Sequence, residues 1–152
     1  LKEKFNEIIY VTNIDNIKKL EQVILSYNKL HDGINLVLFN SVPYAINQHQ
    51  PFKCLIQQIN CHIDKNTDIQ KRSLKKLFRE IDNFKQKNKN IYVFDSYNSL
   101  CEGNKCTIYD KEKDVLFYRD ASHLVSEGSQ TLIPKFRKFI QKLKNEKLIY
   151  NY

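Results

Sequence analysis

Apolar and polar positions along this chain follow two periods, one typical of buried strands and one typical of amphipathic helices. Short apolar, β-branched runs predict three strands: Glu7–Thr12, Ile34–Phe39 and Asn90–Asp95. Apolar residues at helical spacing predict four helices: Asn13–Leu30, Phe52–Cys61, Asp68–Lys87 and Ser126–Glu146. Two further apolar runs, Thr107–Tyr109 and Val115–Tyr118, flank a polar turn and predict a small hairpin.

Strands that alternate with helices in this way predict an α/β three-layer sandwich around a mostly parallel sheet. Only three core strands are predicted, whereas doubly wound sheets usually have about five or six. The chain also contains no methionine. We therefore expect residues 1–152 to be a single domain, the C-terminal portion of a larger fold that lacks its N-terminal strand here.

Composition narrows the class of protein. The chain has 152 residues, of which 41% are hydrophobic and 28% charged, as is typical of one globular domain. No apolar run approaches the roughly 18 residues of a membrane-spanning helix.

The net charge of +8 is concentrated in two stretches. Residues 65–89 hold nine basic and three acidic side chains, and residues 135–147 hold six and one. Two solvated helix faces explain this pattern, and the alternative is attraction to an anionic membrane surface or an acidic polysaccharide. No nucleic-acid motif accompanies the charge, so nucleic acid is not an expected partner.

The chain has four cysteines, and their state, paired or reduced, indicates the redox compartment of the protein: Cys54, Cys61, Cys101 and Cys106. Cys101 and Cys106 enclose a short polar loop with a glycine, which suits a local disulfide in an oxidising compartment. Cys54 and Cys61 can also pair, unless they share one continuous helix, where seven residues span roughly 10 Å. Four reduced, buried thiols are the alternative, and the three possible pairings stay open. The spacings do not fit a zinc site, and no metal is expected.

One stretch carries a recognisable chemical arrangement, with Asp120 three residues before His123 at a predicted strand-to-helix junction. A carboxylate in this position can hold an imidazole in one tautomer and stabilise its charged form. A histidine held in this way is a general base, but the chain contains no obvious nucleophile motif. Ser122 is adjacent to the histidine and is expected to point away from it, and Ser126 and Ser129 are typical of a helix start.

The other histidines, His31, His49 and His62, lack metal-ligand spacing and are interpreted as ordinary surface or loop residues. His49 follows the second predicted strand, near the edge where open α/β sheets bind substrates. It is therefore a minor candidate for substrate contact.

The block from Tyr118 to Leu124, followed by Gly128 and Ser129, resembles the last signature block of the SGNH hydrolases. In that superfamily an Asp-x-x-His motif completes a triad with a serine near the N-terminus. Pro43 after a strand, Pro51 to Cys54 and Cys101 to Cys106 resemble one branch, the extracytoplasmic SGNH domain fused to membrane-bound acyltransferases of family three. These O-acetylases modify lipopolysaccharide O-antigen and other envelope polysaccharides. The resemblance covers roughly residues 5 to 145 and implies an SGNH/flavodoxin-like sheet.

By this resemblance, His123 is the general base and Asp120 its orienting partner. The Gly-Asp-Ser nucleophile block of the family does not occur in this chain, so the serine is expected upstream. Asn13 falls where the family places a polar oxyanion-hole residue, but the Gly or Trp found near this place in relatives is missing. A helix cap is the better-supported role for Asn13, and Asp15 and Asn16 are the other candidates for the cap of the same helix.

The resemblance implies part of an O-acyltransferase or acetyl esterase of cell-envelope polysaccharide, working by a Ser-His-Asp mechanism. It implies a polysaccharide acceptor and an upstream membrane domain that supplies acetyl groups from acetyl-CoA, with no cofactor bound by this segment. The implied location is the periplasmic face of a bacterial inner membrane. The alternative is a catalytically inactive module that binds glycan or plays a structural role, and a cytosolic basic α/β protein with free thiols is a weaker one.

Overall fold

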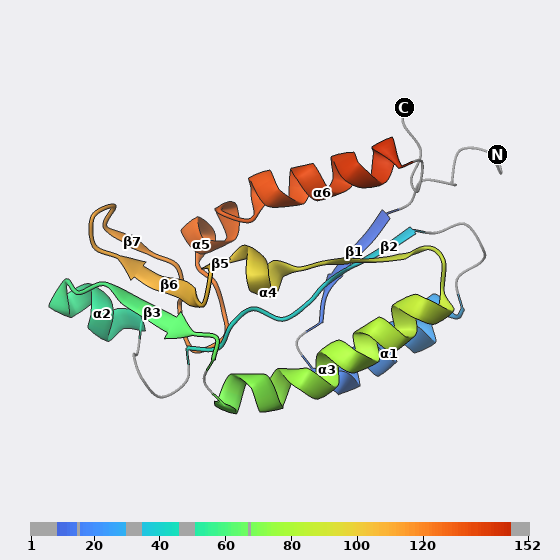
Figure 1. Cartoon of the computed structure of the whole chain (residues 1–152), viewed down its shortest axis with the longest axis horizontal. Helices are drawn as coiled ribbons and strands as arrows, with labels where there is room; N and C mark the ends of the chain where they lie inside the picture. The colour runs from blue at the N-terminus through green and yellow to red at the C-terminus, as the bar shows by residue number, and fades with distance from the viewer. Residues whose placement is uncertain (1–8, 15, 30–34, 46–50, 67, 147–152) are drawn as a thin grey trace. The chain divides into compact units, whose positions relative to one another are not determined.

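A computed structural model describes residues 9–14, 16–29, 35–45, 51–66 and 68–146 (Figure 1). The chain divides into two compact units. The first comprises Leu1–Ser41, Leu74–Asp95 and Phe136–Tyr152, and the second comprises Val42–Ser73 and Ser96–Lys135. In the part of the chain that the structure describes, no helix is both long and apolar enough to cross a membrane.

The first unit contains a parallel sheet in the order β1-β2-β4. Its strands are β1 (Ile9–Asn13), β2 (Asn35–Phe39) and β4 (Ile91–Phe94). The backbone register pairs Asn13 with Phe39, and Phe39 with Phe94, so the three strands end at the same edge. Over the described residues the predicted strands and their parallel arrangement are confirmed, while Glu7, Ile8 and Ile34 lie outside the described residues.

Helices α1 (Ile17–Tyr27), α3 (Asp68–Lys87) and α6 (Ile133–Asn145) accompany this sheet in the sequence. α3 has the bounds expected from its apolar period. α1 begins later than expected because the side chain of Asn16 accepts a hydrogen bond from the Lys19 N–H at 2.8 Å and so forms the N-cap. Of the candidate caps, the structure therefore selects Asn16, while Asn13 belongs to β1 and the helix-cap role expected for it is wrong.

Aromatic side chains hold α6 on the sheet. Phe136 lies 5.0 Å from Phe39 and 5.2 Å from Phe94 between ring centroids, and Phe139 lies 5.5 Å from Phe94. Such pairs add a little to the stabilisation that comes from removing their apolar area from water. A separate edge-to-face contact, between Tyr27 and Phe84 at 6.0 Å, joins α1 to α3.

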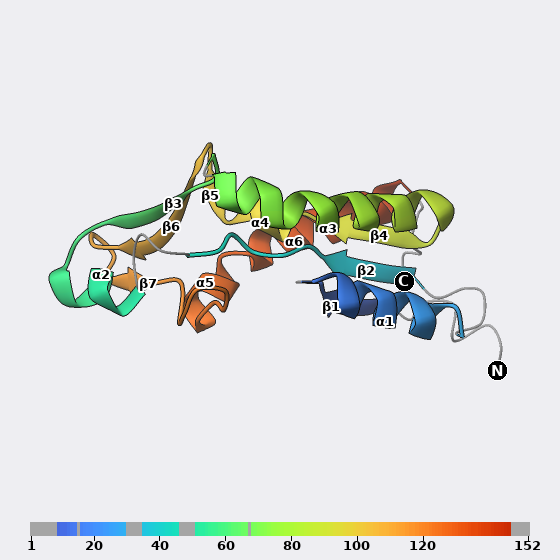
Figure 2. The same cartoon turned by 90° about the horizontal axis from the view of Figure 1, so that it is seen from below.

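The second unit contains an antiparallel sheet with the path β3-β6-β5, and β7 also pairs with β6 (Figures 1 and 2). Its strands are β3 (Cys61–Asp64), β5 (Cys101–Glu102), β6 (Lys105–Asp110) and β7 (Val115–Leu116). The predicted hairpin is confirmed as β6 and β7. This sheet is larger than the sequence indicated, since β3 and β5 were not expected.

Three short helices complete this unit: α2 (Pro51–Gln57), α4 (Ser96–Ser99) and α5 (Ser126–Gln130). The helix expected at Phe52–Cys61 is therefore wrong in its second half. Gln58 has a φ of 51°, a left-handed conformation that ends α2, and Cys61 then begins a strand.

The single helix expected from Ser126 to Glu146 is instead two helices, α5 and α6. α5 ends as the Thr131 hydroxyl donates a hydrogen bond to the Gly128 carbonyl at 2.6 Å. Pro134 lies in the first turn of α6, where backbone N–H groups have no partner within the helix, so its missing N–H costs no hydrogen bond. A proline in this position is typical of the start of a separate helix.

Two disulfides, Cys54–Cys61 and Cys101–Cys106, select one of the three possible pairings. The first joins α2 to β3, with 6.0 Å between the Cα atoms, and this is feasible because α2 ends before Cys61. The second joins the paired strands β5 and β6. Cys54, Cys61 and Cys106 belong to the buried cluster of this unit, together with Ile63, Ile108, Tyr109 and Tyr118.

Replacing either cysteine pair by alanine is expected to lower the free energy of unfolding by about 2 kcal/mol, because each bridge closes a short loop. The two loops have sequence separations of 7 and 5 residues, so the two losses should be similar. Thermal unfolding with and without reductant measures the effect. An unchanged melting temperature on reduction would contradict it.

Candidate active site

The segment between β7 and α5 folds back on itself as a closed loop. Tyr118 and Leu124 form an isolated antiparallel bridge, and the Arg119 N–H donates to the His123 carbonyl at 2.8 Å. The Val125 N–H donates to the Phe117 carbonyl at 3.0 Å. These bonds place residues 120–122 at the tip of the loop, which we call the Asp-His loop (residues 117–125).

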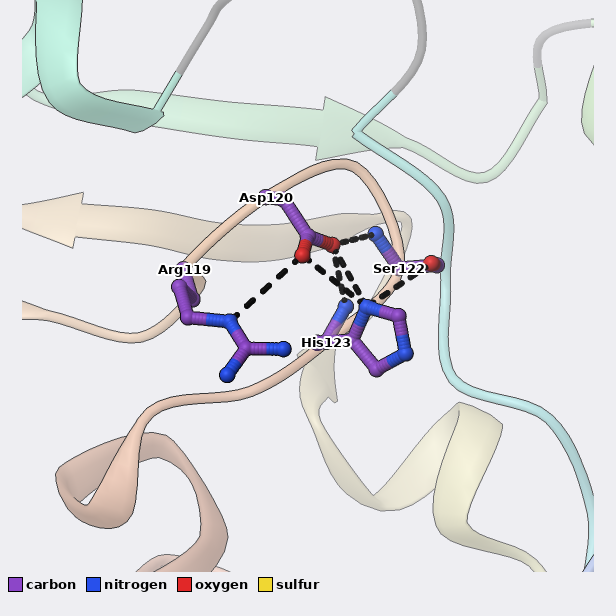
Figure 3. Close-up of polar contacts among 4 residues, drawn as sticks. All are labelled: Arg119, Asp120, Ser122 and His123. Carbon is purple, nitrogen blue, oxygen red and sulfur yellow. Dashed lines mark hydrogen bonds and ion pairs between the residues drawn. The ribbon is translucent and has the colours of Figure 1, made fainter.

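The carboxylate of Asp120 organises the tip of this loop (Figure 3). Its Oδ1 accepts hydrogen bonds from the backbone N–H groups of Ser122 at 3.0 Å and His123 at 2.9 Å. Short acidic side chains commonly bond to backbone groups two or three residues further on. The Asp-x-x-His spacing therefore makes a turn that brings the imidazole onto the carboxylate.

The imidazole of His123 meets the same carboxylate through Nδ1, which lies 2.8 Å from Oδ1 and 2.9 Å from Oδ2 of Asp120. Because an ionised carboxylate only accepts hydrogen bonds, Nδ1 carries the proton and donates it. Nε2 is then the basic nitrogen, and Figure 3 shows it turned away from the carboxylate. The His123 side chain is 61% exposed, so Nε2 is open to a reacting group.

The pKa of the Asp120 carboxyl is held well below its ordinary value. The Ser122 backbone N–H is the largest cause, followed by the hydrogen bond from the His123 side chain. Because folding lowers this pKa, the carboxylate's contribution to stability is complete above the unfolded value of about 3.9. It is lost only as the pH falls toward the lowered folded value, so Asp120 is a fixed negative charge at neutral pH.

Arg119 is the one charged neighbour that sequence reasoning did not single out. Its Nε lies 3.6 Å from Oδ2 of Asp120, and its side chain is 66% exposed. The guanidinium and the imidazole therefore flank the same carboxylate (Figure 3). The only signal in the sequence was its position next to the aspartate, where the motif leaves the residue type open.

Ser122 is not placed as a nucleophile. Its hydroxyl lies 3.4 Å from Nδ1 of His123, the nitrogen that already donates to Asp120, rather than at Nε2. The expectation that the two side chains point apart is wrong, because the hydroxyl contacts the imidazole. The contact is made to the protonated nitrogen, so it gives Ser122 no base to take its proton.

The Asp-His loop is anchored on both sides. The Ala45 N–H donates to the Ala121 carbonyl at 2.7 Å, which ties the tip of the loop to the segment after β2. Tyr118, at the base, is fully buried, and burial raises the pKa of its hydroxyl. Gly128 in α5 packs against the backbone of Phe117, so that an added Cβ would lie 2.2 Å from the Phe117 carbonyl oxygen.

Gly128→Ala is expected to destabilise the protein by about 1–3 kcal/mol, because backbone atoms would have to move to admit the methyl group. Ser129→Ala, at the exposed next position of α5, is the matched control. Urea unfolding of both variants provides the comparison. Equal midpoints would show that the close packing at Gly128 does not constrain the loop.

The structure thus brings together two of the residues predicted from the sequence, Asp120 and His123. Asn13, the oxyanion-hole candidate, is the last residue of β1 and belongs to the other compact unit. His62 is exposed on β3, while His31 and His49 lie outside the described residues. Within the ranges that the structure describes, no group of three or more His, Cys, Asp or Glu residues is arranged to hold a metal ion.

A sequence model of the family described as "SGNH domain (fused to AT3 domains)" matches residues 4–138. The chain belongs to this SGNH domain family. No curated protein and no solved structure matches the chain.

Membership makes this SGNH domain a module of the esterase and acyltransferase type. Domains of the family are extracytoplasmic, and their fusion to AT3 domains indicates an upstream membrane acyltransferase domain. The match includes the Asp-His loop, so the histidine block that suggested the resemblance lies within the family region.

Proposed function

We propose that this SGNH domain transfers or hydrolyses acetyl groups of cell-envelope polysaccharide, with His123 as general base and Asp120 as its orienting partner. The observation that carries the proposal is the double contact of Nδ1 with the carboxylate, at 2.8 and 2.9 Å, which leaves Nε2 free to take a proton. A Ser-His-Asp triad requires this contact between the histidine and the aspartate, and only the serine is not among the residues of the site.

The chain contains no Gly-Asp-Ser block. In this proposal the nucleophile is therefore a serine of the full-length protein outside these 152 residues. Its hydroxyl passes a proton to Nε2 as the oxygen attacks the acetyl carbonyl carbon. The C–O or C–S bond to the acetyl donor then breaks, and the leaving group takes the proton from the imidazolium. In the second step, Nε2 takes the proton of an acceptor hydroxyl or water as its oxygen attacks the acetyl carbonyl carbon. The bond from that carbon to the serine oxygen then breaks, and the serine oxygen takes the proton back from the imidazolium.

Asn13 is the proposed oxyanion-hole residue of this reaction. It ends β1 at the edge where β2 and β4 also end, with Phe39 as its partner in the register. Open α/β sheets bind ligands at the carboxyl ends of their strands, which supports this position.

The membrane partner supplies the acetyl group in this proposal. An upstream membrane domain would take it from acetyl-CoA, so the SGNH domain itself needs no cofactor. The acceptor is a polysaccharide such as lipopolysaccharide O-antigen, on the periplasmic face of a bacterial inner membrane. The exposed cations of α3 and α6 suit an anionic surface nearby: Lys75, Lys76, Arg79, Arg137, Lys138 and Lys142.

We also propose that residues 1–152 belong to one domain built as a three-layer α/β sandwich. The contacts of Phe136 with Phe39 and Phe94 support α6 as one outer layer. The contact of Tyr27 with Phe84 supports α1 and α3 as the other.

The test is acetyl-ester hydrolysis by the full-length protein, with p-nitrophenyl acetate as substrate, in parallel with transfer of a labelled acetyl group to polysaccharide. Rates above background in either assay support the enzyme. Background rates in both, with polysaccharide still bound, would show an inactive glycan-binding module instead.

A further inference from the structure

Arg119 is the only lysine or arginine of the Asp-His loop, and most of its hydrogen-bond donors face solvent. Its side chain is 66% exposed, and its Nε lies 3.6 Å from Oδ2 of Asp120. Within the residues that the structure describes, its two terminal NH₂ groups donate to no acceptor. A guanidinium carries five N–H donors and no acceptor, so these groups are open to a ligand.

The carboxylate of Asp120 is satisfied without Arg119. It accepts the backbone N–H groups of Ser122 at 3.0 Å and His123 at 2.9 Å, and the imidazole N–H at 2.8 Å. The 3.6 Å contact with the guanidinium is longer than a hydrogen bond. Exposed ion pairs of this kind contribute little to stability. The geometry of the loop therefore does not require an arginine at this position.

The guanidinium lies beside the imidazole that the proposed reaction uses. Both groups contact Oδ2 of Asp120, and Figure 3 shows both on the same side of this carboxylate. The side chains of Arg119 and His123 are both well exposed. A molecule that brings an oxygen to Nε2 of His123 therefore also comes within reach of the guanidinium.

The charges of the loop make Arg119 important for an anionic molecule. With His123 neutral, Asp120 and Arg119 carry the only two charges of the loop, and they offset each other. Without the arginine, the carboxylate would repel an anion that approached Nε2. Glu127, in the first turn of α5, adds a further carboxylate just after the loop. An anion can thus approach this histidine favourably only because the arginine is present.

A guanidinium recognises oxyanions in particular, because its planar fork can donate two parallel hydrogen bonds to a carboxylate or a phosphate. The net charge of +8 also attracts anionic polymers from a distance. We propose that Arg119 binds an acidic group of the polysaccharide, a carboxylate or a phosphate, and so holds an acidic sugar at Nε2 of His123. The inference rests on the proposed function and makes the acceptor of that reaction an acidic glycan. A neutral ester such as p-nitrophenyl acetate offers Arg119 no anion, so the role is confined to the glycan.

The first test compares two alkylating probes of similar size on the full-length protein, iodoacetate and iodoacetamide. Nε2 of His123 displaces iodide from either probe, and mass spectrometry of the peptide that contains His123 measures both rates. Since one probe carries a carboxylate and the other a neutral amide, the ratio of the rates measures the attraction of an anion to Nε2. Arg79→Gln is the matched control for Arg119→Gln, because Arg79 is 67% exposed and lies 3.4 Å from the carboxylate of Glu80, on α3.

We expect the ratio of iodoacetate to iodoacetamide rates at His123 to fall by at least about threefold in Arg119→Gln. It should change by less than about 1.5-fold in Arg79→Gln, whose charge lies elsewhere and is screened by salt. An unchanged ratio in Arg119→Gln would overturn the proposal. Equal falls in the two variants would also overturn it, because the effect would then come from the overall charge.

The second test uses three polymers to identify the acidic group: polygalacturonate carries carboxylates, phosphomannan carries phosphates and dextran carries neither. We expect at least one acidic polymer to slow the reaction of His123 with iodoacetamide in the unaltered protein and in Arg79→Gln, but not in Arg119→Gln. The polymer that protects His123 identifies the anion. Protection by neither acidic polymer, or equal protection by dextran, would overturn the proposal.

These binding measurements are separate from catalysis. An inactive protein in which the acidic polymer still protects His123 through Arg119 would refute the proposed function and leave the contact with an acidic glycan standing. An active protein without this protection would overturn the inference and leave the proposed function standing.

Discussion

Replacing His123 by alanine is expected to lower acetyl-ester hydrolysis by the full-length protein by a factor of about 10²–10⁴. The substitution removes Nε2, the only nitrogen of the Asp-His loop that is both unprotonated and turned away from the carboxylate. The serine would then have no partner to take its proton. Initial rates with p-nitrophenyl acetate measure the loss directly.

His62→Ala is the matched control for this experiment, because His62 is also exposed and lies on β3, in the same unit as the loop. Its rate should stay close to that of the unaltered protein. A His123→Ala enzyme that is folded and as fast as the control would remove His123 from the mechanism.

Asp120→Asn is expected to lower the same rate by a factor on the order of 10³–10⁴, as the corresponding change does in other Ser-His-Asp triads. The asparagine oxygen can still accept the backbone N–H groups of Ser122 and His123, so the turn should persist. Its NH₂ group would then donate to Nδ1, which moves the imidazole proton to Nε2. The histidine would stay in place in the tautomer that cannot accept a proton from serine.

Arg119→Gln distinguishes this tautomer effect from a general loss of charge. It removes the 3.6 Å ion pair with Asp120 but leaves the bonds of the carboxylate to His123. Exposed ion pairs contribute about 0.2–1 kcal/mol, so the rate should change by less than about fivefold. Equal losses in Arg119→Gln and Asp120→Asn would mean that charge, and not the tautomer, controls the site.

The site was predictable from sequence to the extent that its bonds are local. Every partner of the Asp120 carboxylate lies within three residues of it, so the Asp-x-x-His spacing contains the geometry. The bond between Ala45 and Ala121 joins segments far apart in the sequence, and two alanines carry no chemical signal.

The secondary structure was likewise predictable only where its signal is local in the sequence. α3 was predicted with its observed bounds because twenty residues repeat one apolar period. β5 has two residues and β3 has four, too few to establish an alternating pattern. The end of α2 depends on the left-handed backbone of Gln58, a conformation that glutamine rarely adopts and that its sequence does not signal.

Covalent labelling can show whether His123 and Asp120 activate a serine. Full-length protein is treated with a fluorophosphonate probe, which bonds to activated serines, and the labelled peptide is identified by mass spectrometry. We predict one labelled serine, with labelling greatly slowed in His123→Ala and unchanged in His62→Ala. Absence of labelling in the unaltered protein, or equal labelling in His123→Ala, would show that His123 does not activate a serine.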